Sequence, residues 1–461
     1  MLSAQEWALL QWGAVDLGDE RLNRRAAEMG ALMAAKPDAS LPQQMQDPAR
    51  LEAAYRLMNN KHVKMQALLK PHCQRTLQAA QQAAVVLWVE DTTELDYTAH
   101  ADKTGLGPIG DGRGRGLLLH STLGVLPDTR IVLGLGHVQV VLRQETAGTD
   151  KRHWTRTPES RLWERSAQAI GAAPQGVQWV HVSDRGSDIF EYMAACVDPH
   201  KHFLLRVFHN RLLSWESELP PGDEAHKLLD YARSLPSVTG STYNVAVQAS
   251  RKHPARPAEV VLSWAQVTVA PPAQAPEAIR RHSPLRLWVL RAWEPHPPPG
   301  VDALEWVLLT SLPIHSLAQA QEKIDWYSCR WLCEDFHQCL KTGCRIEASQ
   351  LDDAADLQNL LGFAAPMAVR LLQLRQEARQ PVELPAVQVV DPLMVEVLAR
   401  LQKISADRLT ARQFFRRVAR LGGFQDRKRD GEPGWRTLWH GWRYLSDVTQ
   451  GARLFHQDDT S

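Results

Sequence analysis

The sequence has no run of eighteen uncharged apolar residues, so it offers no segment long enough for a transmembrane helix. Its N-terminus carries the acidic Glu6 and no basic cluster, which excludes a typical secretory signal. Six cysteines among 461 residues are too few for a disulfide-stabilised scaffold and fit a reducing compartment. These absences together predict a cytoplasmic protein that does not associate with membranes.

A strong excess of charge of either sign is also absent, because the formal net charge at pH 7 is +1. This balance excludes no class of partner, but the charges are unevenly spread. Residues 400–461 hold 13 lysines and arginines against 7 aspartates and glutamates. A basic tail of this size is compatible with nucleic-acid binding and equally with an ordinary protein surface.

Four of the cysteines lie close together, at positions 329, 333, 339 and 344. Their spacing lacks the Cys-x2-Cys knuckle that is typical of structural zinc sites, and the stretch has a helical pattern. Zinc ligands and buried free thiols are both possible from the sequence, and the spacing favours free thiols.

The chain is long enough for two to four domains. Residues 1–80 have the pattern of helices, strand-like runs begin at residue 85, and the pattern after residue 350 is again helical. We therefore expect a helical domain over 1–75, a catalytic core over 76–365 and a helical region over 366–461.

The central region alternates between strand-like and helical runs. The predicted elements are strands at 85–89, 117–126 and 131–142, a helix at 159–170, a strand at 177–182, a helix at 187–197 and a strand at 203–207. This order predicts an α/β fold with a mixed sheet, arranged as an RNase H-like core. In that architecture the ends of the first and fourth strands lie side by side. Asp91 and Asp184 follow those two strands.

Residues 210–300 interrupt this core with proline-rich loops and two strand-like runs, which predicts a β-rich insertion. The run 305–310 is expected to return as a strand of the core. Ser316 to Gln319 form a capping box that opens a long predicted helix to about Thr342.

That predicted helix carries a polar stripe. Tyr327, Arg330, Glu334 and Lys341 fall within an arc of about 60° on one face of an ideal helix. Such a stripe cannot pack against an apolar core. It is either a solvated face with an Arg330–Glu334 pair or part of a functional site.

Glu334 of this stripe and the two strand-end aspartates together suit phosphoryl transfer. Two Mg²⁺ ions about 3.5–4 Å apart can activate a nucleophile and stabilise a leaving oxygen in phosphodiester cleavage. Mg²⁺ prefers oxygen ligands and keeps several waters, so Asp91, Asp184 and Glu334 would suffice to bind it. We expect these three residues to be both catalytic and metal-binding, with Mn²⁺ able to substitute. Arg330 and Lys341 would add positive charge for phosphates.

The stripe Tyr327-x2-Arg330-x3-Glu334-x6-Lys341 resembles the Y-R-E-K signature of a subgroup of bacterial DDE insertion-sequence transposases. Further ordered matches run along nearly the whole chain, at 17–19, 54–56, 90–93, 184–185, 306–311, 330–331, 334–337, 341–343 and 369–374. The resemblance implies cut-and-paste transposition through a DNA hairpin intermediate. It also implies an RNase H-like fold, an N-terminal domain that binds transposon ends and a C-terminal dimerisation region.

Several residue roles are implied by this resemblance. Tyr327 and Arg330 are expected to stabilise a distorted DNA end, and Trp306 to stack on a flipped base. Arg21 and Arg25, four residues apart on one helix face, are expected to contact DNA. The implied partners are double-stranded transposon ends, target DNA and a second copy of the chain, so the protein would be nucleoid-associated when bound.

Two other readings of the whole chain remain open: an RNase H-like nuclease that does not join strands, and a non-catalytic DNA-binding regulator derived from a transposase. Gly105-x-Gly107-x-x-Gly110 matches a dinucleotide fingerprint only by letters, because no helix pattern follows it. Asp188 is interpreted as a structural residue at a helix start. The apolar stripe in 394–404, together with 438–445, is expected either to dimerise or to pack within the chain.

Overall fold

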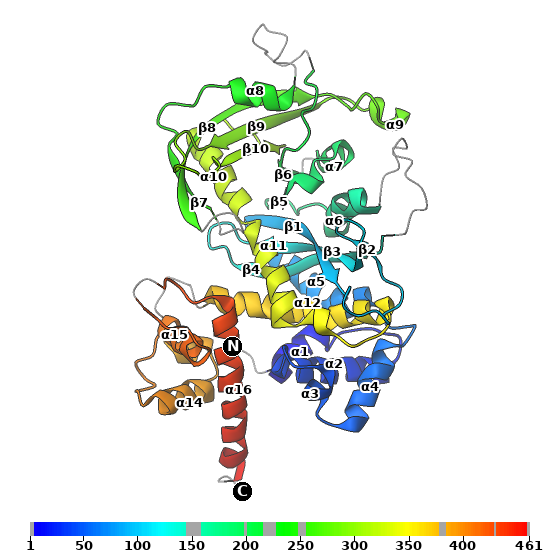
Figure 1. The fold of residues 1–461 in the computed structure, drawn as a ribbon, viewed down its shortest axis with the longest axis vertical. Coiled ribbons are helices and arrows are strands. Elements are labelled where there is room, and N and C mark those ends of the chain that lie inside the picture. Colours follow the sequence, from blue (N-terminus) through cyan, green and yellow to red (C-terminus); the bar gives the residue numbers. More distant parts are fainter. Residues whose placement is uncertain are drawn as a thin grey trace.

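The computed structural model describes residues 4–143, 158–197, 201–214, 227–247, 255–377, 384–427 and 430–458. Helices form the N-terminal part, as the sequence predicts: α1 (Ala4–Trp12), α2 (Glu20–Ala35), α3 (Leu41–Met45), α4 (Pro48–Met58) and α5 (Met65–Ala80). Asp19 caps α2 by accepting a hydrogen bond from the Arg21 amide, at 2.7 Å. Figure 1 shows these helices gathered below the sheet.

A ten-stranded mixed sheet forms the centre of the molecule. Its strands are β1 (Val85–Asp96), β2 (Gly107–Ile109), β3 (Gly114–Val125), β4 (Val132–Val141), β5 (Gln178–Ser183), β6 (His202–Arg206), β7 (Tyr243–Val247), β8 (Arg256–Val269), β9 (Leu285–Trp293) and β10 (Glu305–Thr310). They lie in the order β2-β3-β1-β5-β6-β10-β9-β8-β7, and β4 also pairs with β3. The expected mixed sheet with flanking helical regions is confirmed.

The sequence prediction placed the end of the first strand too early. β1 continues through Asp91 to Asp96, because its antiparallel partner β3 is equally long and pairs with it as far as Asp96 opposite Gly116. The parallel pairing of β1 with β5 stops sooner, at Glu90 opposite Ser183. Asp91 therefore lies inside a strand, at the point where that strand loses its parallel neighbour.

The predicted β-rich insertion is present, and it extends the central sheet instead of standing apart from it. β10 pairs antiparallel with β6, and β9, β8 and β7 follow in turn as antiparallel neighbours. β10 has the same bounds that the sequence predicted for the returning strand.

Helices cover both faces of the sheet (Figure 1). Against one face pack α6 (Leu162–Ile170) and α7 (Phe190–Cys196). Against the other pack α10 (Leu317–Ser328), α11 (Trp331–Gln338) and α12 (Ala354–Glu377). The alternation along β1 follows this division, because Val86 and Trp88 join one apolar cluster whereas Leu87 and Val89 join another.

The prediction of a single long helix over 316–342 is wrong. α10 ends at Ser328 and α11 begins at Trp331, and the amides of Arg330 and Cys333 bond three residues back, to Tyr327 and Arg330. A π-helical turn, Cys339–Gly343, follows α11 and is closed by the Cys344 amide on the Cys339 carbonyl. Both irregularities change the angular position of the residues that follow them.

The C-terminal region is helical, with α13 (Ala386–Val389), α14 (Pro392–Gln402), α15 (Ala411–Leu421) and α16 (Trp435–Asp458). Most of the apolar stripe on α14 is buried within the chain, as are Leu438 and Leu445 of α16. These buried side chains pack internally, whereas Leu401 and Tyr444 in the same ranges are exposed, so a dimer contact through this region stays a prediction. No helix in the described ranges is both long and apolar enough to cross a membrane.

α15 and α16 approach each other so closely that only glycine fits at their contact. A Cβ atom at Gly441 of α16 would lie 1.7 Å from the Val418 carbonyl oxygen, and one at Gly422 would lie 2.0 Å from the Thr437 carbonyl oxygen. Backbone atoms cannot rotate away as a side chain can. The pair of glycines therefore sets the distance between these helices.

Gly441→Ala should destabilise the C-terminal helices by about 2–3 kcal/mol, because the added methyl group overlaps backbone. Gly451→Ala is the matched control on the same helix, where no atom lies within 4 Å of an added Cβ. It should be neutral or stabilise by about 0.5–1 kcal/mol through helix propensity. Thermal unfolding of the two variants measures the contrast, and equal melting temperatures would contradict the close approach.

Candidate active site

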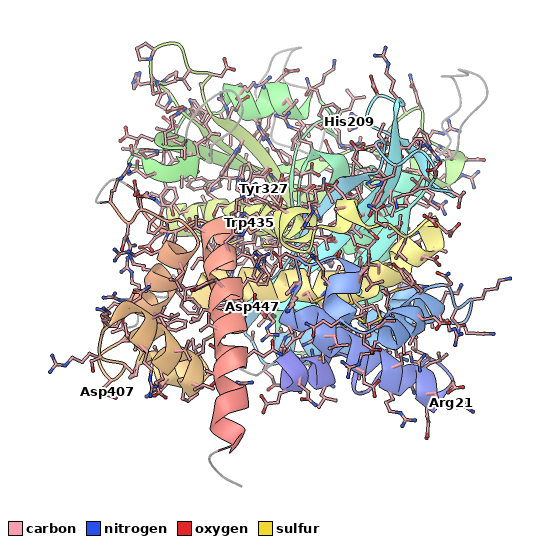
Figure 2. All side chains as sticks on the ribbon, turned by 60° about the horizontal axis from the view of Figure 1, so that its bottom comes forward. Arg21, His209, Tyr327, Asp407, Trp435 and Asp447 are labelled. Atoms are coloured by element: carbon pink, nitrogen blue, oxygen red, sulfur yellow. The ribbon has the colours of Figure 1, made fainter. Side chains whose placement is uncertain are left out.

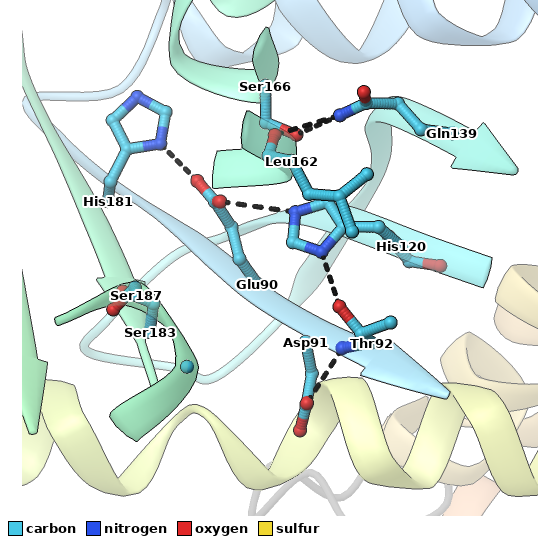
Figure 3. A network of polar contacts seen from close by, with 12 residues as sticks. Glu90, Asp91, Thr92, His120, Gln139, Leu162, Ser166, His181, Ser183 and Ser187 are labelled. Carbon is cyan, nitrogen blue, oxygen red and sulfur yellow. Dashed lines mark hydrogen bonds and ion pairs between the residues drawn. The ribbon is translucent and has the colours of Figure 1, made fainter. Parts of the chain in front are cut away.

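Two aspartates meet where β1 and β5 part. Their parallel register ends at Glu90 and Ser183, so Asp91 and Asp184 are the next residue on each chain segment. Asp91 is buried at 9% exposure, and Figure 3 shows its side chain directed to the opposite side of the strand from that of Glu90. Asp184 caps the short turn after β5 by accepting a hydrogen bond from the Gly186 amide, at 2.9 Å.

Glu334 reaches the same place from α11, which packs against β1 and β3. Arg330, in the junction before α11, links the carboxylates: its Nη1 lies 2.5 Å from Asp91 Oδ2 and 3.3 Å from Glu334 Oε1. The pKa of the Asp91 carboxyl is raised to about 7 by burial, which Arg330 opposes and which Asp184 and Glu334 reinforce. The fold therefore brings Asp91, Asp184, Glu334 and Arg330 into one electrostatically coupled cluster.

Tyr327 and Trp306 lie beside this cluster and are both buried, at 4% and 6% exposure. Their rings meet edge to face with centroids 5.0 Å apart. Burial raises the pKa of the Tyr327 hydroxyl, and the positive charges of Arg330 and Arg206 oppose that shift. Trp306 on β10 thus packs against Tyr327 on α10.

Arg206, at the end of β6, is a further residue of this cluster that the sequence analysis missed. Burial lowers the pKa of its guanidinium, which Tyr327 opposes and Arg185 reinforces. Its Nη2 donates to the Glu305 carbonyl at 2.8 Å. A signal existed: β6 is the parallel neighbour of β5, so its carboxyl end reaches the same sheet edge as Asp184.

Lys341 does not share the cluster of the other stripe residues. It lies in the π-helical turn, and its Nζ is 3.7 Å from Glu347 Oε1. It lines a separate cleft of about 700 Å³ together with Arg345, Arg436 and Arg443. The expectation of one continuous face fails here, because the widened turn alters the helical phase after Gln338.

Arg21 and Arg25 are exposed on α2, far from the carboxylate cluster. Figure 2 shows Arg21 at the outer edge of the N-terminal helices, whereas Tyr327 lies in the middle of the molecule. Arg25 lines a cleft of about 1200 Å³ between the N-terminal helices and the helices α14 and α16. Arg24, Arg50, Arg370 and Arg453 line the same cleft.

A second polar network lies directly behind Asp91, on the other face of the sheet (Figure 3). His181 Nδ1 donates to Glu90 Oε1, and His120 Nε2 lies 3.4 Å from Glu90 Oε2. His120 Nδ1 in turn is 2.8 Å from the Thr92 hydroxyl. Burial alone would raise the pKa of Glu90, but the two histidines outweigh it and hold that pKa below its usual value.

This network ties both sequence neighbours of Asp91 to strands β3 and β5. Glu90, His120 and His181 are essentially inaccessible to solvent. The contacts hold β1 in place on either side of Asp91 and leave its carboxylate free to face α11. The sequence identified Glu90 and Thr92 only as parts of a motif. Their histidine partners lie on other strands, so no neighbouring residue in the sequence indicates the network.

The four clustered cysteines are free thiols. Cys333 and Cys344 donate to the backbone carbonyls of Ser121 and Ala364, each at 3.6 Å. In the described part of the chain, no three histidine, cysteine, aspartate or glutamate side chains lie close enough together to hold a metal ion as they stand. Two of the four thiols are thus directed at the backbone of two different elements, β3 and α12.

Two models of known protein families match this chain, one near each end. Residues 4–63 match the model of a transposase DNA-binding domain. Residues 367–459 match the model of the transposase Tn5 dimerisation domain. The chain thus carries an N-terminal DNA-binding domain and a C-terminal dimerisation domain of the transposase type. This pair of domains makes it similar to transposases of the Tn5 family.

Asp188 is structural, as expected, but for a different reason. Its buried carboxylate accepts hydrogen bonds from the amides of Phe208 and His209, at 2.8 and 2.7 Å, and from Arg211 Nε, at 2.8 Å. It therefore anchors the segment after β6 instead of stabilising a helix dipole. α7 begins only at Phe190.

Asp188→Ala should lower the stability by about 3–5 kcal/mol, because it leaves Arg211 and two amides without their acceptor in a buried place. Asp230→Ala, which removes an exposed carboxylate in the same region, should change it by less than about 0.5 kcal/mol. Thermal unfolding and the rate of proteolysis after β6 would measure both. A stable Asp188→Ala protein would contradict the anchoring role.

Proposed function

We propose that this transposase excises its element by a cut-and-paste reaction. It would bind the two transposon ends as a homodimer, cleave them by Mg²⁺-dependent phosphoryl transfer through a DNA hairpin and join the 3′ ends to target DNA. One observation carries the proposal: Asp91, Asp184 and Glu334 converge from β1, β5 and α11 in a chain that also has both transposase end domains.

The arrangement of the strands supports an RNase H-like catalytic core. Taken alone, five strands lie in the order β4-β3-β1-β5-β6, with antiparallel pairing among the first three and parallel pairing among the last three. We propose the core over 76–365, between an end-binding domain over 1–75 and a dimerisation and DNA-contacting region over 366–461. The strands within 210–300 are an insertion at the edge of that core.

The carboxylate cluster fits a divalent cation with oxygen ligands. Burial raises the pKa of Asp91 to about 7, and the neighbouring charges of Asp184 and Glu334 reinforce this. This repulsion is the condition that a divalent cation relieves. Mg²⁺ held there, or Mn²⁺ in its place, would supply the charge that activates the attacking oxygen and stabilises the leaving oxygen.

The cations around the cluster suit the phosphates of a DNA end. Arg330 can form two parallel hydrogen bonds to a phosphate, and Tyr327 can donate one through its hydroxyl. Lys341, in the neighbouring basic cleft, would hold phosphates further along the duplex. Arg21 and Arg25 are exposed on the N-terminal helices, where they would contact the transposon end independently of the carboxylate cluster.

Self-association is proposed through surfaces of the C-terminal helices other than the buried stripe. Met394, Val395 and Leu398 already pack within the chain. Leu401 and Tyr444 are exposed, at 42% and 49%, and so remain available on α14 and α16. A dimer through such surfaces would place two active sites on one pair of DNA ends.

The central test replaces each carboxylate by its amide: Asp91→Asn, Asp184→Asn and Glu334→Gln. Each should reduce Mg²⁺-dependent cleavage of linear DNA carrying the terminal repeats to less than about a thousandth of wild type, since each removes a metal ligand. Gel-shift binding of the same DNA should be nearly unchanged. The matched control Glu322→Gln alters an exposed glutamate of α10 and should cleave normally.

The outcomes separate the competing functions. Cleavage without joining of 3′ ends would indicate a nuclease, and binding without any cleavage by the wild type would indicate a regulator. Substantial cleavage by Glu334→Gln would overturn the assignment of the site.

Trp306 provides a second test, on the hairpin step. To stack on a flipped base its ring must leave the contact with Tyr327, because only 6% of it is exposed. Stacking is worth about 1–3 kcal/mol per base. Trp306→Ala should therefore permit the first nick but slow hairpin formation by about ten- to a hundredfold.

If Trp306 has only a structural role, its replacement should give a different result from the one expected for base stacking. Its removal would cost about 3–5 kcal/mol of stability and impair both steps. An abasic nucleotide, placed in turn at positions near the DNA end, should restore hairpin formation only if the residue stabilises a flipped base. Val307→Ala, which removes a buried side chain from the same strand, serves as the packing control.

A further inference from the structure

Arg330 lies between two carboxylates that the proposed function assigns to metal binding. A single guanidinium nitrogen, Nη1, contacts both Asp91 Oδ2 and Glu334 Oε1, at 2.5 and 3.3 Å. Arg330 thereby supplies a positive charge between a strand residue and a helix residue. A divalent cation that bound both carboxylates would have to lie in this same region.

The guanidinium is held in that position on several sides. Its side chain is 12% exposed, and its charged group lies 5.1 Å from the centre of the Trp331 ring. An arginine side chain keeps its positive charge in proteins. Arg330 therefore places a full positive charge beside Asp91.

The backbone at Arg330 also differs from that of an ordinary helix residue. Cys329 and Arg330 form the junction between α10 and α11, where successive amides bond three residues back. The junction directs the Arg330 side chain toward β1, although Glu334 follows one turn later on α11. A continuous helix would instead have paired Arg330 with Glu334 alone, along its surface.

Arg330 partly neutralises the charge of the carboxylates that would bind a metal ion. Among the described residues no ready-made set of three metal-binding side chains exists, and Arg330 occupies the place where two of them would meet. The buried negative charge is already neutralised in part by the protein itself. A metal ion must therefore compete with a counter-ion that is covalently part of the chain.

We propose that Arg330 is the built-in counter-ion of this cluster, and that divalent metal binds tightly only after a DNA phosphate draws the guanidinium away. The inference rests on the proposed function, because it takes Asp91 and Glu334 as metal ligands. A phosphate suits the exchange, since a guanidinium binds it with two parallel hydrogen bonds. Binding of DNA and binding of metal would then each strengthen the other by the same factor.

The test measures metal binding without any reaction. Free Mn²⁺ is titrated by electron paramagnetic resonance against DNA-free protein, with all variants compared at the same pH. An opposite charge within reach changes the proton affinity of a carboxylate by about ten- to a thousandfold, so Arg330→Gln should bind Mn²⁺ at least about ten times more tightly than wild type. Arg330→Lys, which keeps the charge, should remain close to wild type.

The matched control is Arg375→Gln. Arg375 is a buried arginine that pairs with Asp335, the residue next to Glu334, and does not contact the cluster. Its replacement should leave the Mn²⁺ affinity unchanged. Circular dichroism and the melting temperature establish that each variant is folded before titration, and a folded Arg330→Ala substitutes for a glutamine variant that is not.

DNA gives the second readout. A short duplex should strengthen Mn²⁺ binding by a larger factor in the wild type than in Arg330→Gln, where the competing charge is already gone. Equal or weaker Mn²⁺ binding by DNA-free Arg330→Gln would overturn the inference. If Asp91→Asn in the Arg330→Gln background binds Mn²⁺ undiminished, the carboxylates are not the metal site and the proposed function fails instead.

Discussion

Repulsion among three carboxylates at the junction of β1 and β5 is the constraint on which the site depends. Asp91 cannot move away, because it lies inside a strand that pairs with β3 from Leu87 to Asp96. Asp184 caps its own turn, and Glu334 is carried by a helix packed on the same strands. The fold holds the like charges together, and the positive charge of Arg330 makes the arrangement tolerable without DNA.

The two faces of β1 have different roles: one holds the strand in place, and the other presents the carboxylate of Asp91. Glu90 and Thr92 point into a buried network with His120 and His181, whereas Asp91 between them points to α11. A buried carboxylate is costly unless its charge is compensated and its oxygens accept hydrogen bonds. His181 donates a hydrogen bond to one oxygen of Glu90, and His120 lies 3.4 Å from the other, so the buried network supports the strand on either side of Asp91.

Periodicity in the sequence predicted most of the elements of the sheet, because strands that are buried on both faces leave strong apolar runs. It also brought Asp91 and Asp184 together, since the order of strands alone determines which ends are neighbours. It failed where local geometry departs from a regular helix: the break at Arg330 and the π turn before Lys341 depend on packing against β1 and α12. Arg206 and the histidine network were missed because their partners lie on distant strands. The stripe on α14 was found, but periodicity cannot distinguish a surface that binds another chain from one that packs within its own.

The helix α12 connects the central part of the molecule to the matched dimerisation domain. It runs from Ala354 to Glu377, a length of about 36 Å, and contains Pro366. Its first half packs against the N-terminal helices, where the Gly362 carbonyl accepts a hydrogen bond from Trp12. Its second half lies in the matched dimerisation domain, which begins at residue 367, and contacts β4 through Gln373. The border between the two units thus falls inside one hydrogen-bonded helix and not in a linker. Pro366 has no amide hydrogen, so one hydrogen bond of the helix is missing at the border itself, and bending or local opening between the two units is easiest there.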